Sequence, residues 1–158
     1  MSVLYLLDTN VVLALVRGGP LGQYIDVTYG LRKAKRRPTI SVVTHGEVRV
    51  LARRNNWGDD KCAALQRALD ALVTVDVNIT EVIDAYVEID IYSQLHPDGA
   101  RNMGKNDLWI AACAMASGAT LLTTDKDFDH LHASPPDPGL LTVSYIDPSS
   151  TLASGSGP

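Results

Sequence analysis

The sequence predicts an α/β protein in which a mainly parallel sheet lies between two layers of helices. Short apolar runs that end in polar residues alternate with longer segments whose apolar residues recur every three or four positions. A run that is apolar throughout is typical of a strand buried on both faces, as in parallel sheets. At 158 residues the chain has the length of one domain. We therefore expect a single three-layer α/β/α domain over residues 1–147.

The first strand and the first two helices come from the opening 36 residues. Residues 3–7 are all apolar and predict a strand, after which Thr9 or Asn10 can cap a helix. The segment Gly18-Gly19-Pro20 interrupts this helix. A second, more basic helix is expected from residue 21 to about residue 36, before a proline.

The middle of the chain continues the alternation of strands and helices. Thr44 and Glu47 fit the spacing of a capping box, which predicts that a helix begins there. The expected elements are a strand at 39–41, a helix from Thr44 to about 55, a helix opening at 58–60, a strand at 73–75 and a helix from 79 to about 95.

The last third supplies one helix and two strands. Asn106 is expected to cap a helix that Gly118 ends, and residues 119–122 read as a buried strand. Another strand is expected at 141–146, after a proline-rich loop. Residues 148–158 have the small, polar composition of a flexible tail, and their Ser-Gly-Ser-Gly-Pro ending is of a kind that cloning can add.

Composition and charge narrow the possible classes of protein. Hydrophobic residues make up 46% and charged residues 20%, as in an ordinary soluble protein. The net charge of -4 argues only weakly against a nucleic-acid partner, because four carboxylates set aside for a metal site leave a neutral remainder. No segment is typical of a secretion signal or a membrane span. We expect a cytoplasmic protein with no membrane partner and with Cys62 and Cys113 as free, buried thiols.

Four acidic residues are predicted to meet at one edge of the sheet. Asp8 and Asp125 follow the two most apolar strand candidates, so a parallel sheet places both at its carboxyl edge. Asp107 and Glu47 lie in the first turns of two predicted helices and can point toward the same edge. Each acid alone has an ordinary explanation as a helix cap or turn residue. The convergence of all four favours a functional site.

Converging carboxylates require a counterion. Two carboxylates about 4 Å apart repel by roughly 4 kcal/mol at an effective dielectric constant near 20. Oxygen ligands without cysteine or suitably spaced histidine favour Mg²⁺ or Mn²⁺ over Zn²⁺. Such an ion can activate a bound water for attack on a phosphodiester. The sequence therefore predicts hydrolysis of a nucleic-acid backbone.

Four sequence blocks, in order, resemble the signature blocks of PIN domains, and most closely those of the VapC toxins of bacterial toxin–antitoxin pairs. The blocks are Leu7-Asp8-Thr9-Asn10-Val11, Ser41-Val42-Val43-Thr44-His45-Gly46-Glu47, Asn106-Asp107-Leu108-Trp109-Ile110-Ala111-Ala112 and Leu122-Thr123-Thr124-Asp125-Lys126-Asp127-Phe128. The resemblance covers roughly residues 3–146. It implies a Mg²⁺- or Mn²⁺-dependent endoribonuclease, a homodimer, and inhibition by a small VapB-like antitoxin protein laid along the active-site groove.

The resemblance also implies a role for individual residues. Asp8, Asp107 and Asp125 would bind the metal directly or through water, and Glu47 would hold or deprotonate a metal-bound water. Thr9 and Thr124 would support these ligands with their hydroxyl groups, and Asp127 would serve as an outer ligand. The role of Asn106 is expected to be that of a helix cap rather than a contact to substrate.

One dense basic segment, residues 32–37, is a candidate for RNA binding. The candidate phosphate contacts are Arg17, Arg32, Lys33, Lys35, Arg36, Arg37 and Lys126, with Arg53 and Arg54 as further candidates. The ordinary alternative is a solvated helix end. Contacts of this kind hold RNA without reading its sequence.

Other functions remain open at this stage. A housekeeping PIN nuclease in RNA maturation would share every acid with a toxin. A phosphoacceptor signalling domain also places acids at strand ends, but the segment Asp8-Thr9-Asn10 lacks the adjacent second acid expected there. A PIN-shaped RNA-binding module without catalytic activity is a third alternative.

Overall fold

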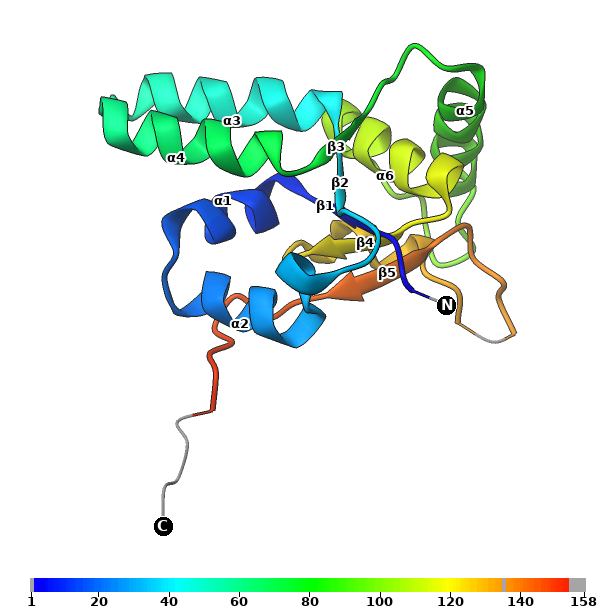
Figure 1. The fold of residues 1–158 in the computed structure, drawn as a ribbon. Helices are drawn as coiled ribbons and strands as arrows, with labels where there is room; N and C mark the ends of the chain where they lie inside the picture. Colours follow the sequence, from blue (N-terminus) through cyan, green and yellow to red (C-terminus); the bar gives the residue numbers. More distant parts are fainter. Residues whose placement is uncertain (1, 135, 154–158) are drawn as a thin grey trace.

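A five-stranded, all-parallel sheet forms the centre of the protein. The computed structural model describes residues 2–134 and 136–153 (Figure 1). The strands are β1 (Tyr5–Leu7), β2 (Thr39–Ser41), β3 (Val73–Val75), β4 (Thr120–Thr123) and β5 (Thr142–Tyr145). Their order across the sheet is β3-β2-β1-β4-β5, and every neighbouring pair is parallel. The predicted parallel sheet is confirmed.

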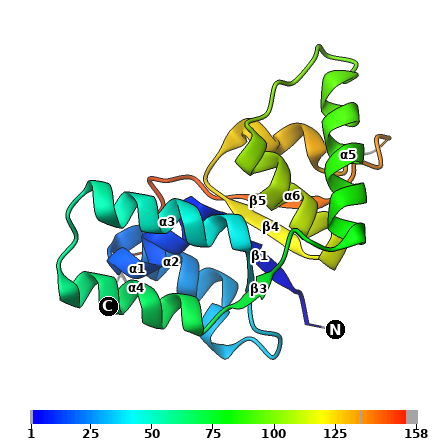
Figure 2. The same ribbon diagram turned by 90° about the horizontal axis from the view of Figure 1, so that it is seen from above.

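Helices cover both faces of this sheet. The helical elements are α1 (Thr9–Arg17), α2 (Pro20–Tyr29), η1 (Leu31–Lys33), α3 (Val42–Arg54), α4 (Asp59–Asp70), α5 (Thr80–Gln94), α6 (Lys105–Ser117) and η2 (Lys126–Leu131). The first four α-helices pack on one face and α5 and α6 on the other (Figure 2). The three-layer α/β/α fold predicted from the sequence is therefore confirmed.

Alternating residues of the central strands supply the two cores. Leu6 of β1 and Leu121 of β4 belong to the core under α5 and α6, whereas Leu7 and Leu122 belong to the core under α1 to α4. All four side chains are fully buried, and burial of each contributes roughly 1.5–3 kcal/mol. This explains why two consecutive residues of each central strand are apolar, where a strand buried on one face would alternate apolar with polar residues.

Two helix boundaries differ from the sequence-based expectation because of local capping. The predicted helix over 21–36 ends at Tyr29, where Gly30 adopts φ 61° and donates its N–H to the Asp26 carbonyl. Helix α3 begins at Val42 rather than near Thr44, because the Ser41 side chain accepts the N–H of Val43. The predicted capping box of Thr44 is wrong, since Thr44 lies inside the helix.

Two other caps were also misassigned. Asp8, and neither Thr9 nor Asn10, caps α1 by accepting the N–H of Thr9. Helix α6 begins at Lys105 with Gly104 at its N-cap position, so Asn106 is not a cap. In both cases a side chain of the acidic region has a different partner from the one expected.

Both cysteines are free thiols, but only Cys113 is buried; the expected burial of Cys62 is wrong, because Cys62 lies on the exposed side of α4. The described residues include no helix that is both long and apolar enough to cross a lipid bilayer. Residues 148–153 contain no helix or strand, and residues 154–158 of the expected tail lie outside the described part of the chain.

Candidate metal centre

The fold brings the four predicted acids to one cavity. Asp8 directly follows β1, and Asp125 comes two residues after β4, so both lie at the carboxyl ends of adjacent central strands. Glu47 projects from the second turn of α3 and Asp107 from the first turn of α6. All four line a cavity of about 530 Å³. We call this space the acidic cavity.

Asp8 is the most buried of these acids, with only 4% of its surface exposed. Its Oδ1 accepts the N–H of Thr9 at 2.8 Å, and its Oδ2 accepts the hydroxyl of Thr123 at 2.7 Å. Burial raises the pKa of Asp8, whereas the hydrogen bonds from Thr123 and Thr9 act in the opposite direction. The carboxylate is therefore fixed in position and carries unfavourable charge.

Glu47 is held by residues from two other helices. The Thr9 hydroxyl donates to Glu47 Oε1 at 2.7 Å and lies 3.1 Å from the buried hydroxyl of Thr44. The amide Nδ2 of Asn106 donates to Glu47 Oε2 at 3.4 Å. Asn106, which sequence reasoning treated as a cap, instead orients a carboxylate.

A short turn after β4 carries Asp125 and Asp127. The Thr123 hydroxyl accepts the N–H of Asp125 at 3.0 Å, and Asp125 Oδ1 accepts the N–H of Asp127 at 2.8 Å. Thr123 therefore contacts both Asp8 and the backbone of Asp125. Thr124, the hydroxyl expected here from sequence, makes no side-chain hydrogen bond to another described residue. The Thr-x-Asp spacing, typical of a turn closed by a threonine hydroxyl, could have identified Thr123.

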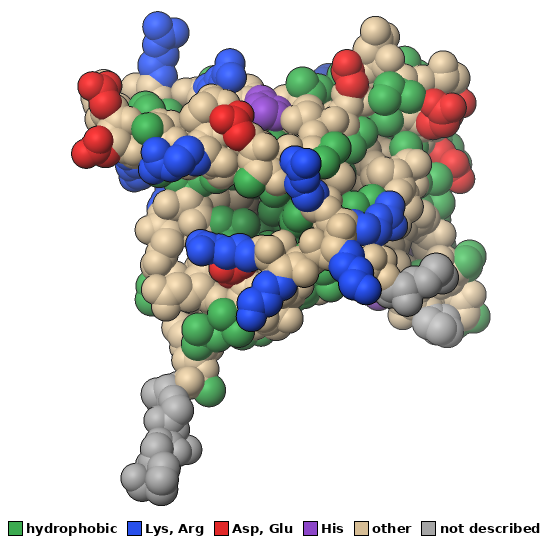
Figure 3. Space-filling model, viewed as in Figure 1, with side chains coloured by type: hydrophobic (Ala, Val, Ile, Leu, Met, Phe, Trp, Pro, Cys, Tyr) green, Lys and Arg blue, Asp and Glu red, His purple; other side chains and the backbone are tan. Residues whose placement is uncertain are grey.

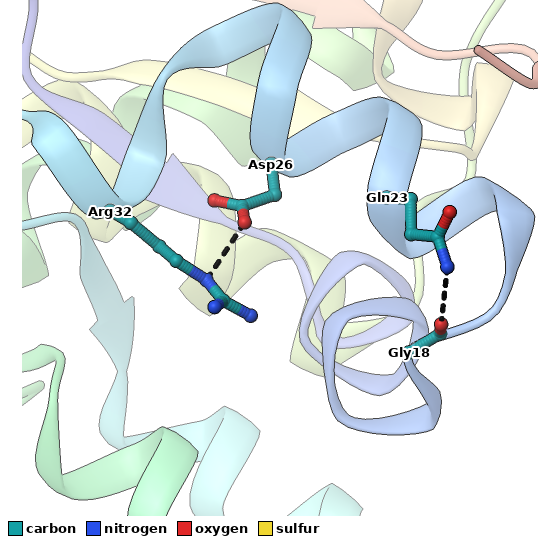
Figure 4. Close-up of polar contacts among 4 residues, drawn as sticks. All are labelled: Gly18, Gln23, Asp26 and Arg32. Carbon is teal, nitrogen blue, oxygen red and sulfur yellow. Dashed lines mark hydrogen bonds and ion pairs between the residues drawn. The ribbon is translucent and has the colours of Figure 1, made fainter.

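The carboxylates of this region repel one another. Burial raises the pKa of Asp107 to about 6, helped by the negative charges of Asp8, Asp125, Glu47 and Asp127, in that order. Among residues 2–134 and 136–153, one ion pair lies within 4.0 Å, and it joins Arg32 Nε to Asp26 at 2.8 Å (Figure 4). No described basic side chain therefore forms an ion pair with Asp8, Glu47, Asp107 or Asp125.

The arrangement fits a hard divalent cation. Asp107, Asp125 and Asp127 each offer a carboxylate oxygen within 4.8 Å of the other two. Asp127, expected as an outer ligand, thus lies in the tightest group. Asp8 and Glu47 lie outside this triad but line the acidic cavity together with Asp107 and Asp125. Oxygen ligands of this kind suit Mg²⁺ or Mn²⁺, and such an ion would relieve the repulsion.

The basic residues proposed for RNA binding do not gather around these acids. Residues 32–37 come just before β2, so they lie at the amino ends of the parallel strands, the opposite end of the sheet. Arg17 lies in the last turn of α1, and Asp8 caps the first. Of the seven candidates, Lys126 alone adjoins the acids in sequence. Arg54 lines the acidic cavity itself.

The fold and the site together define an α/β protein with a candidate divalent-cation centre at the carboxyl ends of its parallel strands. Residues 5–133 match the family model of the PIN domain, so the chain belongs to the PIN domain family. Members of this family are nucleases. The resemblance noted in the sequence is confirmed at the level of the family.

Solved structures of VapBC complexes share this fold. VapBC2 from Rickettsia felis is 23% identical over 91% of this chain and 99% of that one, with a TM-score of 0.69. VapBC-1 from Haemophilus influenzae is 20% identical over 90% and 97%, with a TM-score of 0.69. VapBC-5 from Mycobacterium tuberculosis is 22% identical over 89% and 97%, with a TM-score of 0.60. The comparison with curated sequences finds no match to this chain.

Proposed function

We propose that this protein is a Mg²⁺- or Mn²⁺-dependent endoribonuclease. The observation that carries the proposal is the acidic cavity, in which carboxylates from four separate segments converge without a basic partner among the described residues. Such an arrangement is costly unless it binds a cation. Placed in a PIN domain, the cavity is suited to cutting phosphodiester bonds.

We assign each acidic side chain a separate role in the proposed hydrolysis. Asp107, Asp125 and Asp127 would hold the ion, with Asp8 adding negative charge behind them. When bound, Mg²⁺ or Mn²⁺ makes a coordinated water more acidic and offsets charge on the phosphate. Glu47 would accept the proton of the attacking water, a role supported by the hydrogen bonds with which Thr9 and Asn106 orient its carboxylate.

Total RNA provides a direct test. Purified protein should cut RNA with Mg²⁺ or Mn²⁺ and lose that activity with EDTA. The Asp125→Asn variant, prepared in parallel, should be inactive and still folded. An equal rate of cutting by the variant would trace the activity to a contaminating nuclease and refute the proposal.

We propose further that the enzyme acts in the cytoplasm as the toxin of a VapBC-type pair. The similar solved structures are described as VapBC complexes, which supports a VapB-like antitoxin as partner. Expression without an antitoxin should arrest growth, and Asp8→Asn should remove the arrest. Normal growth with abundant soluble wild-type protein would favour the housekeeping alternative in RNA maturation.

A homodimer is the assembly that we propose. Exposed apolar residues recur every fourth position along and beyond α5, at Ile79, Ile83, Val87, Ile91 and Leu95, with 42–75% of their surface exposed. Residues 68–100 contain no Lys or Arg and seven acids. If the α5 surfaces of two copies met, their acidic residues would repel one another. We therefore propose that α5 of one copy contacts the exposed face of α3 of the other, which carries Val50, Arg49 and Arg53.

Sedimentation provides the test of this assembly. The wild-type protein should sediment as a dimer at tens of micromolar, and Val87→Glu as a monomer with unchanged circular dichroism. A wild-type monomer at that concentration would refute the homodimer.

A further inference from the structure

A second, larger cavity adjoins the acidic cavity. It has a volume of about 760 Å³, and its lining includes His96, Arg101, Lys126, Asp127 and His130. We call it the histidine pocket. Lys126 and Asp127 directly follow Asp125 in the chain, and the Asp127 carboxylate belongs to the group of three that fits a cation. The two cavities therefore lie next to each other along the segment from Asp125 to Asp127.

Fixed rings form one wall of the histidine pocket. The ring centres of His96 and His130 are 5.6 Å apart, and Tyr92 lies 5.8 Å from His96 and 6.5 Å from His130. His130 Nε2 is 2.8 Å from the hydroxyl of Ser93, a fully buried residue. The Tyr92 hydroxyl donates to Asp137 at 2.8 Å. His96 Nδ1 accepts the N–H of Asp98 at 3.3 Å. Each imidazole ring thus has a hydrogen-bond partner that orients it, so a planar ligand would meet a preformed surface.

The charges of the pocket suit a nucleotide better than a simple anion. Arg101 and Lys126 are exposed, and within the described part of the chain neither lies within 4.0 Å of a carboxylate. Both can therefore bind a backbone phosphate. Asp98, Asp127, Asp129 and Asp137 also line the pocket, where they would repel a free anion. Asp98 and Asp129 can accept hydrogen bonds from nucleobase N–H groups.

We infer that the histidine pocket binds one nucleotide of single-stranded RNA beside the scissile phosphate, with its phosphate on Arg101 and Lys126 and its base against His96. The inference rests on the proposed function, because it assigns the substrate of the same enzyme. Unpaired bases stack on aromatic and imidazole rings, and a stacking contact tolerates different bases. The pocket thus supplies affinity and position more than sequence selectivity.

Binding and cleavage of labelled RNA test this assignment together. Fluorescein-labelled 12-nucleotide single-stranded RNA of mixed sequence would be titrated by anisotropy, and its cleavage followed with Mn²⁺. The Arg101→Ala variant should bind at least roughly fivefold more weakly, and the slope of log K against log salt should fall by about 0.7. Arg67→Ala, which removes an exposed arginine of α4, is the matched control and should behave as wild type.

A pair of substitutions at His96 separates stacking from folding. His96→Ala should weaken binding by roughly fivefold or more, the smallest effect expected for loss of one stacked base. His96→Phe keeps a ring and should retain most of the affinity. Substrates shortened by one nucleotide at a time should reveal a length below which Arg101→Ala no longer matters.

The outcomes separate the inference from the function that it rests on. If the wild-type protein neither binds nor cuts RNA, both proposals fail. If it cuts RNA and Arg101→Ala and His96→Ala do so with unchanged KM, the function stands and the pocket assignment is wrong. Loss of binding to a partner protein, with RNA cleavage intact in the same variants, would assign the pocket to that partner and overturn the inference.

Discussion

The two ends of the parallel sheet carry opposite charge in opposite settings. At the carboxyl end, Asp8 is buried and Glu47, Asp107 and Asp125 are half-buried, and threonine and asparagine side chains hold Asp8 and Glu47. At the amino end, a dense run of cations lies exposed around an apolar cavity of about 400 Å³ that is lined by Leu15, Leu31 and Leu72. Figure 3 shows Lys and Arg side chains around a hollow floored by hydrophobic ones. Charge density along a sequence is therefore a poorer guide to a reactive site than where each charge meets the sheet.

The largest expected effect of a single substitution is at the carboxyl end. Asp125→Asn removes one oxyanion of the triad and should lower the cleavage rate by roughly a thousandfold, because metal-ion catalysis is worth several kcal/mol. Asp26→Asn makes the same chemical change at the amino end, where Asp26 pairs with the exposed Arg32. It should change the rate less than about twofold. The measurement is cleavage of labelled RNA under single-turnover conditions.

Comparable losses in the two aspartate variants would abolish the distinction between the ends of the sheet. Circular dichroism and thermal melts of both proteins are needed beside the kinetics, so that misfolding is not counted as lost chemistry.

The next largest effect should come from the hydroxyl behind the acids. Thr123→Val is nearly isosteric but removes the hydrogen-bond partner of Asp8 Oδ2 and of the Asp125 N–H. We expect a 10- to 100-fold loss of activity, the usual result of removing a residue that orients metal ligands, and a loss of about 1–3 kcal/mol of stability. Thr124→Val, one residue further along, should be close to wild type in both. Equal effects of the two would show that the hydroxyl of Thr123 has no special part.

The four acids could be placed from sequence because each follows a strong pattern. Short apolar runs, residues 3–7 and Leu121-Leu122, precede Asp8 and Asp125, and parallel strands bring their carboxyl ends to one edge. What supports the acids could not be placed in the same way. Thr44 and Asn106 contact residues 35 and 59 positions away, and such contacts depend on how helices pack rather than on local pattern. The basic run was assigned to RNA binding on its density of positive charge alone, which says nothing of the end of the sheet at which it lies.

A smaller effect concerns stability and pH. The folded protein holds Asp107 with a pKa of about 6, above its ordinary value of 3.8, so the folded state binds more protons between these values. The contribution of Asp107 to unfolding free energy therefore falls as the pH rises from about 4 to above 6. In metal-free buffer at pH 7.5, Asp107→Asn should melt a few degrees higher than wild type, and the gap should close toward pH 4.

A bound metal ion should reduce the difference in melting temperature between Asp107→Asn and the wild-type protein. Added Mn²⁺ should raise the melting temperature of the wild-type protein at pH 7.5 and change that of Asp107→Asn less, because the variant lacks one charged ligand. Calorimetry with and without EDTA measures both. The histidines are common to the two proteins and cancel in the difference. If the metal-free wild-type protein melts at or above the temperature of Asp107→Asn at every pH from 4 to 7.5, the charge of Asp107 does not destabilise the fold.

The smallest effect should come from the basic run itself. Substituting Lys35 and Arg36 by alanine removes two exposed charges from the amino end of the sheet, where neither lines the acidic cavity. KM for RNA should change less than about twofold, and the salt dependence of binding should keep its slope. Arg54→Ala removes only one charge, yet Arg54 lines the acidic cavity, so the slope should fall by about 0.7. If the double variant instead loses more slope than Arg54→Ala, RNA must wrap from one end of the sheet to the other, and the amino end would belong to the substrate path after all.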